Sequence, residues 1–180
     1  MKKILLLVFV WVMVEGCGPK CQDDPDLTID ELSWVNCYSN RQILIFKSDS
    51  GSIDTLIAKK HIDSNNQRTD NNGCIHNYQN AVVAIDSNSG GTLFNIRVQH
   101  GNKYYPYSGS YTGGLAFAGI DAYQNFGLSS YSFPTPQNNA LINGTYYNNV
   151  YVMLSGIYYT KQNGIISFND NNGVQWIKIN

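Results

Sequence analysis

Short apolar stretches, each followed by a polar turn, recur along most of the chain. In residues 93–98 the side chains alternate, with Phe94, Ile96 and Val98 on one face, which is typical of a half-buried antiparallel strand. Residues 43–46 are a short apolar run, an Asp-Ser-Gly-Ser turn cluster follows, and residues 53–58 are expected to be the returning strand of a hairpin. Residues 81–85 have the composition of a buried strand. The pattern therefore predicts a chain built from short strands.

The C-terminal third repeats this pattern most clearly. Asn143-Gly144 separates two short apolar runs, and this dipeptide is the strongest local signal for a tight hairpin. Four further extended runs follow, at residues 150–154, 157–160, 165–168 and 174–179. Only Thr28 to Glu31, with capping-box spacing, predicts a turn of helix. We expect an all-β, mainly antiparallel fold, either a β-sandwich or a curved barrel-like sheet with at most short helical turns.

Three segments are less regular. Residues 34–38 have the pattern of an extended segment, and the polar residues 61–78 predict a loop pinned by Cys74. Residues 101–139 contain one candidate strand, at 115–120, among glycines, prolines and tyrosines. Long irregular stretches within a compact domain are often functional, so this last segment is the first place to look for a binding surface.

The N-terminus has a different hydrophobic pattern. Lys2 and Lys3 precede an unbroken apolar run over residues 4–14, and Gly16-Cys17 follows it. This is the layout of a secretory signal peptide, and the run is too short to cross a bilayer as a helix, which needs about 20 residues. We expect residues 1–16 to be the signal peptide, 17–28 a lipidated tether and 29–180 a single β-rich domain.

Gly16-Cys17 resembles the lipobox of bacterial lipoproteins, in which the cysteine receives the lipid and becomes the mature N-terminus. Val14 and Glu15 stand where the lipobox usually has Leu and a small residue. A plain cleaved signal with an incidental cysteine and an uncleaved anchor are the alternatives to acylation of Cys17. The cluster Gln22-Asp23-Asp24 resembles surface-export signals of Bacteroidota lipoproteins, and an ordinary acidic linker is its alternative.

The C-terminal strands carry a second resemblance. The pattern Tyr158-Tyr159-x-Lys161-x-x-Gly164-Ile165-Ile166-x-Phe168, followed by a turn and a strand with Trp176, is similar to the end of small uncharacterised Bacteroidota envelope lipoproteins. The resemblance implies a β-rich protein of the cell envelope, anchored to the outer membrane by its lipid and facing the periplasm or the cell surface. It implies no catalytic residue.

Charge excludes one class of partner. The chain has 12 Lys and Arg against 13 Asp and Glu, for a net charge of −1. Because binding to a phosphate backbone depends on a basic surplus, we expect no nucleic acid partner. The 13 tyrosines and the many asparagines have a simpler explanation in AT-rich codons and in the β-propensity of Tyr.

Four cysteines restrict the disulfide pairing. If Cys17 carries lipid, then Cys21, Cys37 and Cys74 remain, which leaves one unpaired or paired between molecules. Cys37 and Cys74 lie within the expected domain, so we expect them to form the disulfide in an oxidising envelope. Zinc is the alternative, but the cysteine spacing matches no common zinc site. We expect no metal and no cofactor.

The search for catalytic motifs finds none. The three histidines show no metal-ligand spacing, and no nucleophile elbow occurs. We therefore expect a non-enzymatic envelope lipoprotein domain that is attached to the membrane through Cys17 and binds a ligand or partner on its β scaffold. A glycan-binding module and an unrecognised hydrolase are the alternatives. The candidate binding surface, for a glycan or a protein, consists of four tyrosines in the irregular segment: Tyr104, Tyr105, Tyr107 and Tyr111.

Overall fold

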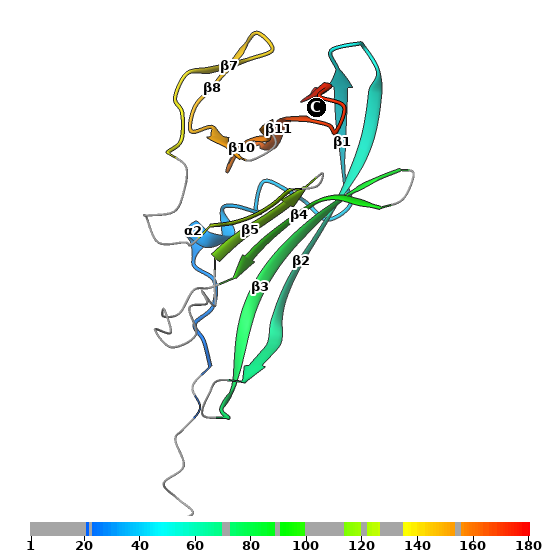
Figure 1. The fold of residues 1–180 in the computed structure, drawn as a ribbon. Coiled ribbons are helices and arrows are strands. Elements are labelled where there is room, and N and C mark those ends of the chain that lie inside the picture. The colour runs from blue at the N-terminus through cyan, green and yellow to red at the C-terminus, as the bar shows by residue number, and fades with distance from the viewer. Residues whose placement is uncertain are drawn as a thin grey trace, which may run out of the picture.

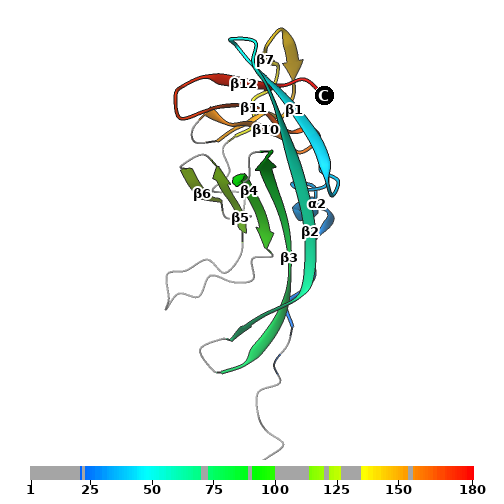
Figure 2. The same ribbon diagram turned by 90° about the vertical axis from the view of Figure 1, so that its right-hand side faces the viewer.

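The computed structural model describes Cys21 and residues 23–69, 73–88, 91–99, 114–119, 122–126, 135–153 and 156–180. Ten strands of this part of the chain form one antiparallel sheet, in the order β6-β5-β4-β3-β2-β1-β12-β11-β10-β9. The sheet is strongly curled into a half-barrel (Figure 1, Figure 2). The predicted all-β fold with a curved sheet is therefore confirmed, and the described residues contain almost no helix.

The sheet is a meander whose last strand returns to its centre. Strand β12 pairs with β1 on one side and with β11 on the other, so the N-terminal and C-terminal halves share one sheet. The strands are β1 (Gln42–Ser48), β2 (Ile53–Thr69), β3 (Ile75–Ser87), β4 (Thr92–Gln99), β5 (Gly114–Gly119), β6 (Ala122–Phe126), β9 (Tyr151–Val152), β10 (Tyr158–Thr160), β11 (Gly164–Asn169) and β12 (Gln175–Lys178).

A separate two-stranded hairpin of β7 (Ala140–Ile142) and β8 (Thr145–Tyr147) is the predicted Asn-Gly hairpin. Asn143 and Gly144 both have positive φ, at 48° and 76°, as the favoured two-residue hairpin turn requires. Ile142 packs beneath the hairpin against Val150 and Ile166 in a small second core. The hairpin is therefore packed on the sheet near β10 and β11.

The polar stretch at residues 61–78 is not the loop that its composition predicts. Strand β2 continues to Thr69 and pairs with β3 from Ile75 onward, with one register shift between Asp63 and Asn66. The two strands form a long ribbon that extends beyond the rest of the sheet (Figure 2). Such a ribbon is solvated on both faces, and its backbone hydrogen bonds do not require apolar alternation.

The main core lies on one face of the sheet, here called the core face, which carries Leu44, Phe46, Leu56 and Ala58. Residues 34–38 pack onto it, and they form a turn rather than the predicted extended segment. This turn follows the short helix α2 (Ile29–Leu32), which begins with the predicted capping box. None of the helical residues in the described part of the chain forms a helix long and apolar enough to cross a membrane.

Candidate functional site

The segment after Cys21 is bound along the edge of β3. Strand β3 pairs with β4 from Asn80 to Asp86. The N-terminal segment lies beside the earlier part of β3, between the ribbon tip and Asn80. The Asp24 amide donates to the Asn77 carbonyl at 2.9 Å, and Asp23 Oδ1 accepts from the amide and from the side chain of Asn77 at 2.9 and 3.0 Å. We call this contact the tether dock.

Electrostatics and a further hydrogen bond support the tether dock. The two hydrogen bonds from Asn77 lower the pKa of the exposed Asp23 carboxyl below its usual value. The Leu27 amide donates to Gln79 Oε1 at 2.9 Å, and Leu27 itself is buried in the main core. Residues 17–28 were expected to be a simple tether, but at least Asp23, Asp24 and Leu27 are fixed to the folded domain.

The disulfide joins Cys21 to Cys74, with a Cα–Cα distance of 5.5 Å. The predicted Cys37–Cys74 pairing is therefore wrong. Cys37 carries a free thiol on the turn above the core face, where its sulfur lies 3.5 Å from the Tyr159 hydroxyl. Cys74 precedes β3 at the ribbon tip, and the docked N-terminal segment brings Cys21 within bonding reach of it.

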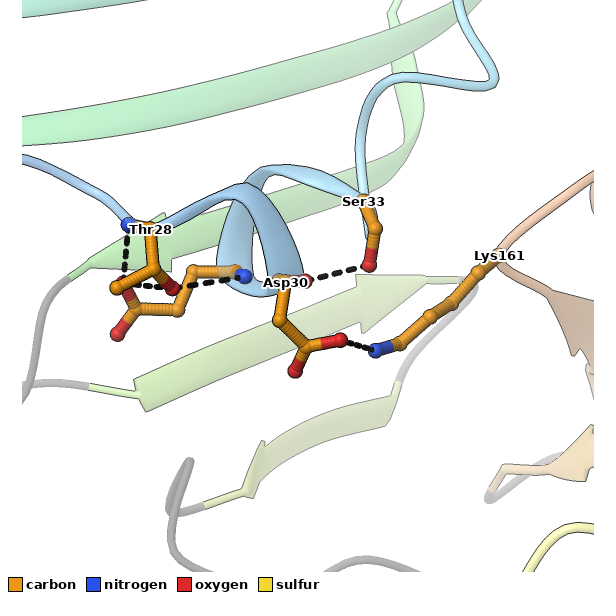
Figure 3. A network of polar contacts seen from close by, with 5 residues as sticks. Thr28, Asp30, Ser33 and Lys161 are labelled. Atoms are coloured by element: carbon orange, nitrogen blue, oxygen red, sulfur yellow. Dashed lines mark hydrogen bonds and ion pairs between the residues drawn. The ribbon is translucent and has the colours of Figure 1, made fainter.

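A polar network attaches α2 to the turn between β10 and β11 (Figure 3). Thr28 and Glu31 complete the capping box, and Asp30, the helical residue before Glu31, forms an ion pair with Lys161 at 2.7 Å. The Lys161 ammonium also lies 4.8 Å from the centre of the Trp34 ring. One lysine from the C-terminal half therefore binds both the helix and the turn that follows it.

Two tyrosine hydroxyls join the same turn to the C-terminal strands, one from β10 and one from the turn itself. Tyr159 is fully buried, stacks on Trp34, and donates its hydroxyl to the Trp34 carbonyl. The Tyr38 hydroxyl accepts from the Ile165 amide at 2.7 Å. Burial raises the pKa of both tyrosines well above the usual value, so both remain protonated.

These contacts give a structural account of the C-terminal sequence pattern. Tyr159 and Lys161 hold the turn at residues 34–38, and Gly164 leaves room for Tyr38. The pattern therefore secures the packing of the N-terminal segment on the sheet. The sequence shows this pattern, but it does not show that the turn at residues 34–38 is the segment it contacts.

Catalytic chemistry has little support among the described residues. Burial is the main cause that raises the pKa of the Cys37 thiol, which keeps it protonated and weakly nucleophilic. Within the described ranges, no three His, Cys, Asp or Glu side chains are grouped so that they could hold a metal ion. Cys17 and the predicted binding tyrosines Tyr104, Tyr105, Tyr107 and Tyr111 lie outside the described residues.

The β7–β8 hairpin is the described element with the clearest features of a binding surface. Leu141 and Tyr146 lie directly opposite each other on its outer face and are 58% and 70% exposed. At its base, Asn148 Oδ1 accepts from the Asn139 amide and Asn138 Oδ1 accepts from the Asn149 amide, both at 3.2 Å. Sequence reasoning found the hairpin but not this surface, for which the Asn-Asn pair on each side was the available signal.

A second exposed apolar surface covers the outer side of the sheet centre. Ile43 faces Ile57 across β1 and β2, and Ile53 faces Lys47 at the other end. Ile43 and Ile53 are 56% and 66% exposed, so this face is apolar but carries a positive charge. It differs in this respect from the hairpin, which has no charged residue.

Comparison with known proteins gives no match: no protein-family model, no curated protein and no solved structure is similar to this chain.

Proposed function

We propose that this protein is a non-enzymatic lipoprotein of the cell envelope, acylated at Cys17, that binds a ligand or partner at the end of its sheet opposite the lipid. The tether dock is the observation that carries the proposal. Together with the adjacent Cys21–Cys74 disulfide, it fixes the chain from four residues after Cys17 onward to the tip of the β2–β3 ribbon. Because four extended residues span at most about 14 Å, a lipid on Cys17 would hold the ribbon tip close to the membrane surface.

Two further observations support an envelope location and a defined orientation. The Cys21–Cys74 disulfide is of a kind that persists in oxidising compartments such as the envelope. The β7–β8 hairpin lies at the opposite end of the molecule from the docked segment in both views (Figure 1, Figure 2). If the ribbon tip lies at the membrane surface, this hairpin therefore lies at the end of the molecule that points away from the membrane.

Binding is better supported than catalysis. The described carboxylates with lowered pKa have structural partners: Asp23 bonds Asn77, Asp86 bonds Lys59 and Thr92, and Asp170 bonds Trp176. The Cys37 thiol is held in its protonated form. These three carboxylates and this thiol are thus engaged in contacts that hold the fold together.

Metabolic labelling with a palmitate analogue tests the anchor. The full-length wild type, expressed in a diderm bacterium, should incorporate label and resist alkaline extraction from membranes, whereas Cys17→Ala should do neither. Cys37→Ala is the matched control, since it removes a thiol and should keep the label. Equal labelling of wild type and Cys17→Ala would refute the proposed anchor.

A further inference from the structure

We propose that the outer face of the β7–β8 hairpin binds a neutral glycan, with the Tyr146 ring as the stacking platform. The inference rests on the proposed function in one respect, because it names the ligand for the end of the molecule that would lie away from the membrane. The juxtaposition that carries it is an exposed Leu141–Tyr146 pair beside four exposed asparagines at the hairpin base.

The hairpin is a rigid platform. The Gln137 and Val150 backbones exchange two hydrogen bonds, at 2.8 and 2.9 Å, directly below the reciprocal asparagine bonds. Asn139 and Asn149 hold positive φ angles of 56° and 54°, which Asn tolerates better than most residues. A surface fixed in this way loses little conformational entropy when a ligand binds.

The ligand should be neutral because the segment carries no charge. From Ala122 to Thr160 the sequence contains no Asp, Glu, Lys, Arg or His. A charged ligand would lose hydration on this surface without gaining an opposite charge. A ligand whose polar groups are hydroxyls loses less, because carboxamides can replace its water.

The residue types match the two kinds of surface on a sugar ring. The axial C–H bonds of a pyranose form an apolar patch that packs on an aromatic face, and Tyr146 exposes such a face beside Leu141. Asn148 lies two residues after Tyr146, just past the end of β8 and roughly 7 Å away, and its Oδ1 is used by the Asn139 amide. Its Nδ2 group can therefore donate to a sugar hydroxyl next to the stacked ring.

Size favours a glycan over a protein partner. The exposed apolar area consists of two side chains ringed by carboxamides, and a standard protein interface needs about 800 Å² on each partner. A surface of this size is large enough to contact one or two sugar units.

Affinity electrophoresis with the full-length, detergent-solubilised protein tests the inference. Native gels would contain dextran, laminarin, galactomannan or soluble starch as neutral probes, and alginate as the charged probe. We expect retardation by at least one neutral polysaccharide and none by alginate. Tyr146→Ala should weaken the apparent affinity at least about tenfold, since stacking is lost, whereas Tyr146→Phe should keep most of it.

The controls make each outcome decisive. Ile53→Ala truncates another exposed apolar side chain, far from the hairpin in sequence, and should leave retardation unchanged. Unchanged melting temperatures would show that the variants are folded. Failure of all four neutral probes, or retardation that survives Tyr146→Ala, would overturn the inference. Tyr146-dependent cross-linking to an envelope protein without any retardation would overturn it in favour of a protein partner. None of these outcomes depends on acylation of Cys17. Failure of the proposed membrane anchor is therefore distinguishable from failure of the glycan inference.

Discussion

The Tyr38 hydroxyl occupies the space where any side chain at position 164 would begin. A Cβ added to Gly164 would lie 2.3 Å from the Tyr38 hydroxyl oxygen and 2.4 Å from the ring carbon that carries it. Gly164 also has a φ of +71°, which disfavours other residues. The Tyr38 ring is fully enclosed, so it cannot move aside without losing its hydrogen bond from Ile165.

We therefore expect Gly164→Ala to destabilise the protein by about 3 kcal/mol, because left-handed backbone strain adds to overpacking. Urea unfolding monitored by circular dichroism measures this loss. Gly173→Ala is the matched control, since its φ is +78° and no heavy atom beyond its two chain neighbours lies within 4 Å of an added Cβ. It should cost only about 1 kcal/mol, and equal losses would contradict the close approach of Tyr38.

Tyr159→Phe removes one hydroxyl from the main core. The Trp34 carbonyl then loses its buried donor, so we expect the free energy of unfolding to fall by about 1–3 kcal/mol. Tyr146→Phe removes the same group from a side chain that is 70% exposed and should change stability by less than about 0.5 kcal/mol. Chemical denaturation of the three proteins under identical conditions provides the comparison.

The Cys21–Cys74 disulfide closes a loop with a sequence separation of 53. On the loop-entropy account its removal by Cys21→Ser costs up to about 4 kcal/mol, and it should also release residues 23–27 from β3. Hydrogen exchange at the Asp24 and Asn77 amides would report this release as a loss of protection.

Cys37→Ser is the control for this substitution, because it leaves the disulfide in place. Peptide mapping without reductant should recover Cys21 linked to Cys74 from the wild type and from Cys37→Ser alike. A peptide linking Cys37 to Cys74 in the wild type would show that the pairing described above is wrong.

Asp170 should contribute to the pH dependence of stability. Its carboxylate accepts hydrogen bonds from the Trp176 indole, which is the main cause of its lowered pKa, and from the Val174 and Asn172 amides. Because the folded pKa lies below the unfolded value of 3.8, its contribution is present above that value and is lost as the pH falls through the folded pKa.

The difference in unfolding free energy between about pH 6 and about pH 3 should therefore be smaller in Asp170→Asn than in the wild type. Trp176→Phe keeps an aromatic ring but removes the indole donor, so it should raise the pKa of Asp170 toward the unfolded value. Carbon-detected NMR titration of the carboxyl measures that pKa directly. An unchanged pKa in Trp176→Phe would contradict the assigned cause.

Local pattern was sufficient to predict most strands and their tight turns. The β1–β2 pair follows from an apolar run, a Ser-Gly turn and a returning strand, and the β7–β8 hairpin follows from Asn143-Gly144. The capping box at Thr28 was also predicted correctly. These features depend on residues within a few positions of one another, so the sequence contains all of their determinants.

The polar ribbon shows where pattern fails. Strand β2 continues to Thr69, and β3 already begins at Ile75. The residues of this ribbon show no apolar alternation, because both of its faces are solvated. Hydrogen bonding between the strands, rather than burial, defines them there. A prediction based on burial therefore described the same residues as a loop.

By itself, the sequence determined the all-β class, the order of the strands along the chain and the local turns, since each of these follows from neighbouring residues. Only the tertiary structure decided that Cys21 pairs with Cys74, that β12 lies beside β1, and that residues 34–38 close over Tyr159. These pairings join positions far apart in the chain. They depend on how the sheet curls, and no local pattern encodes that.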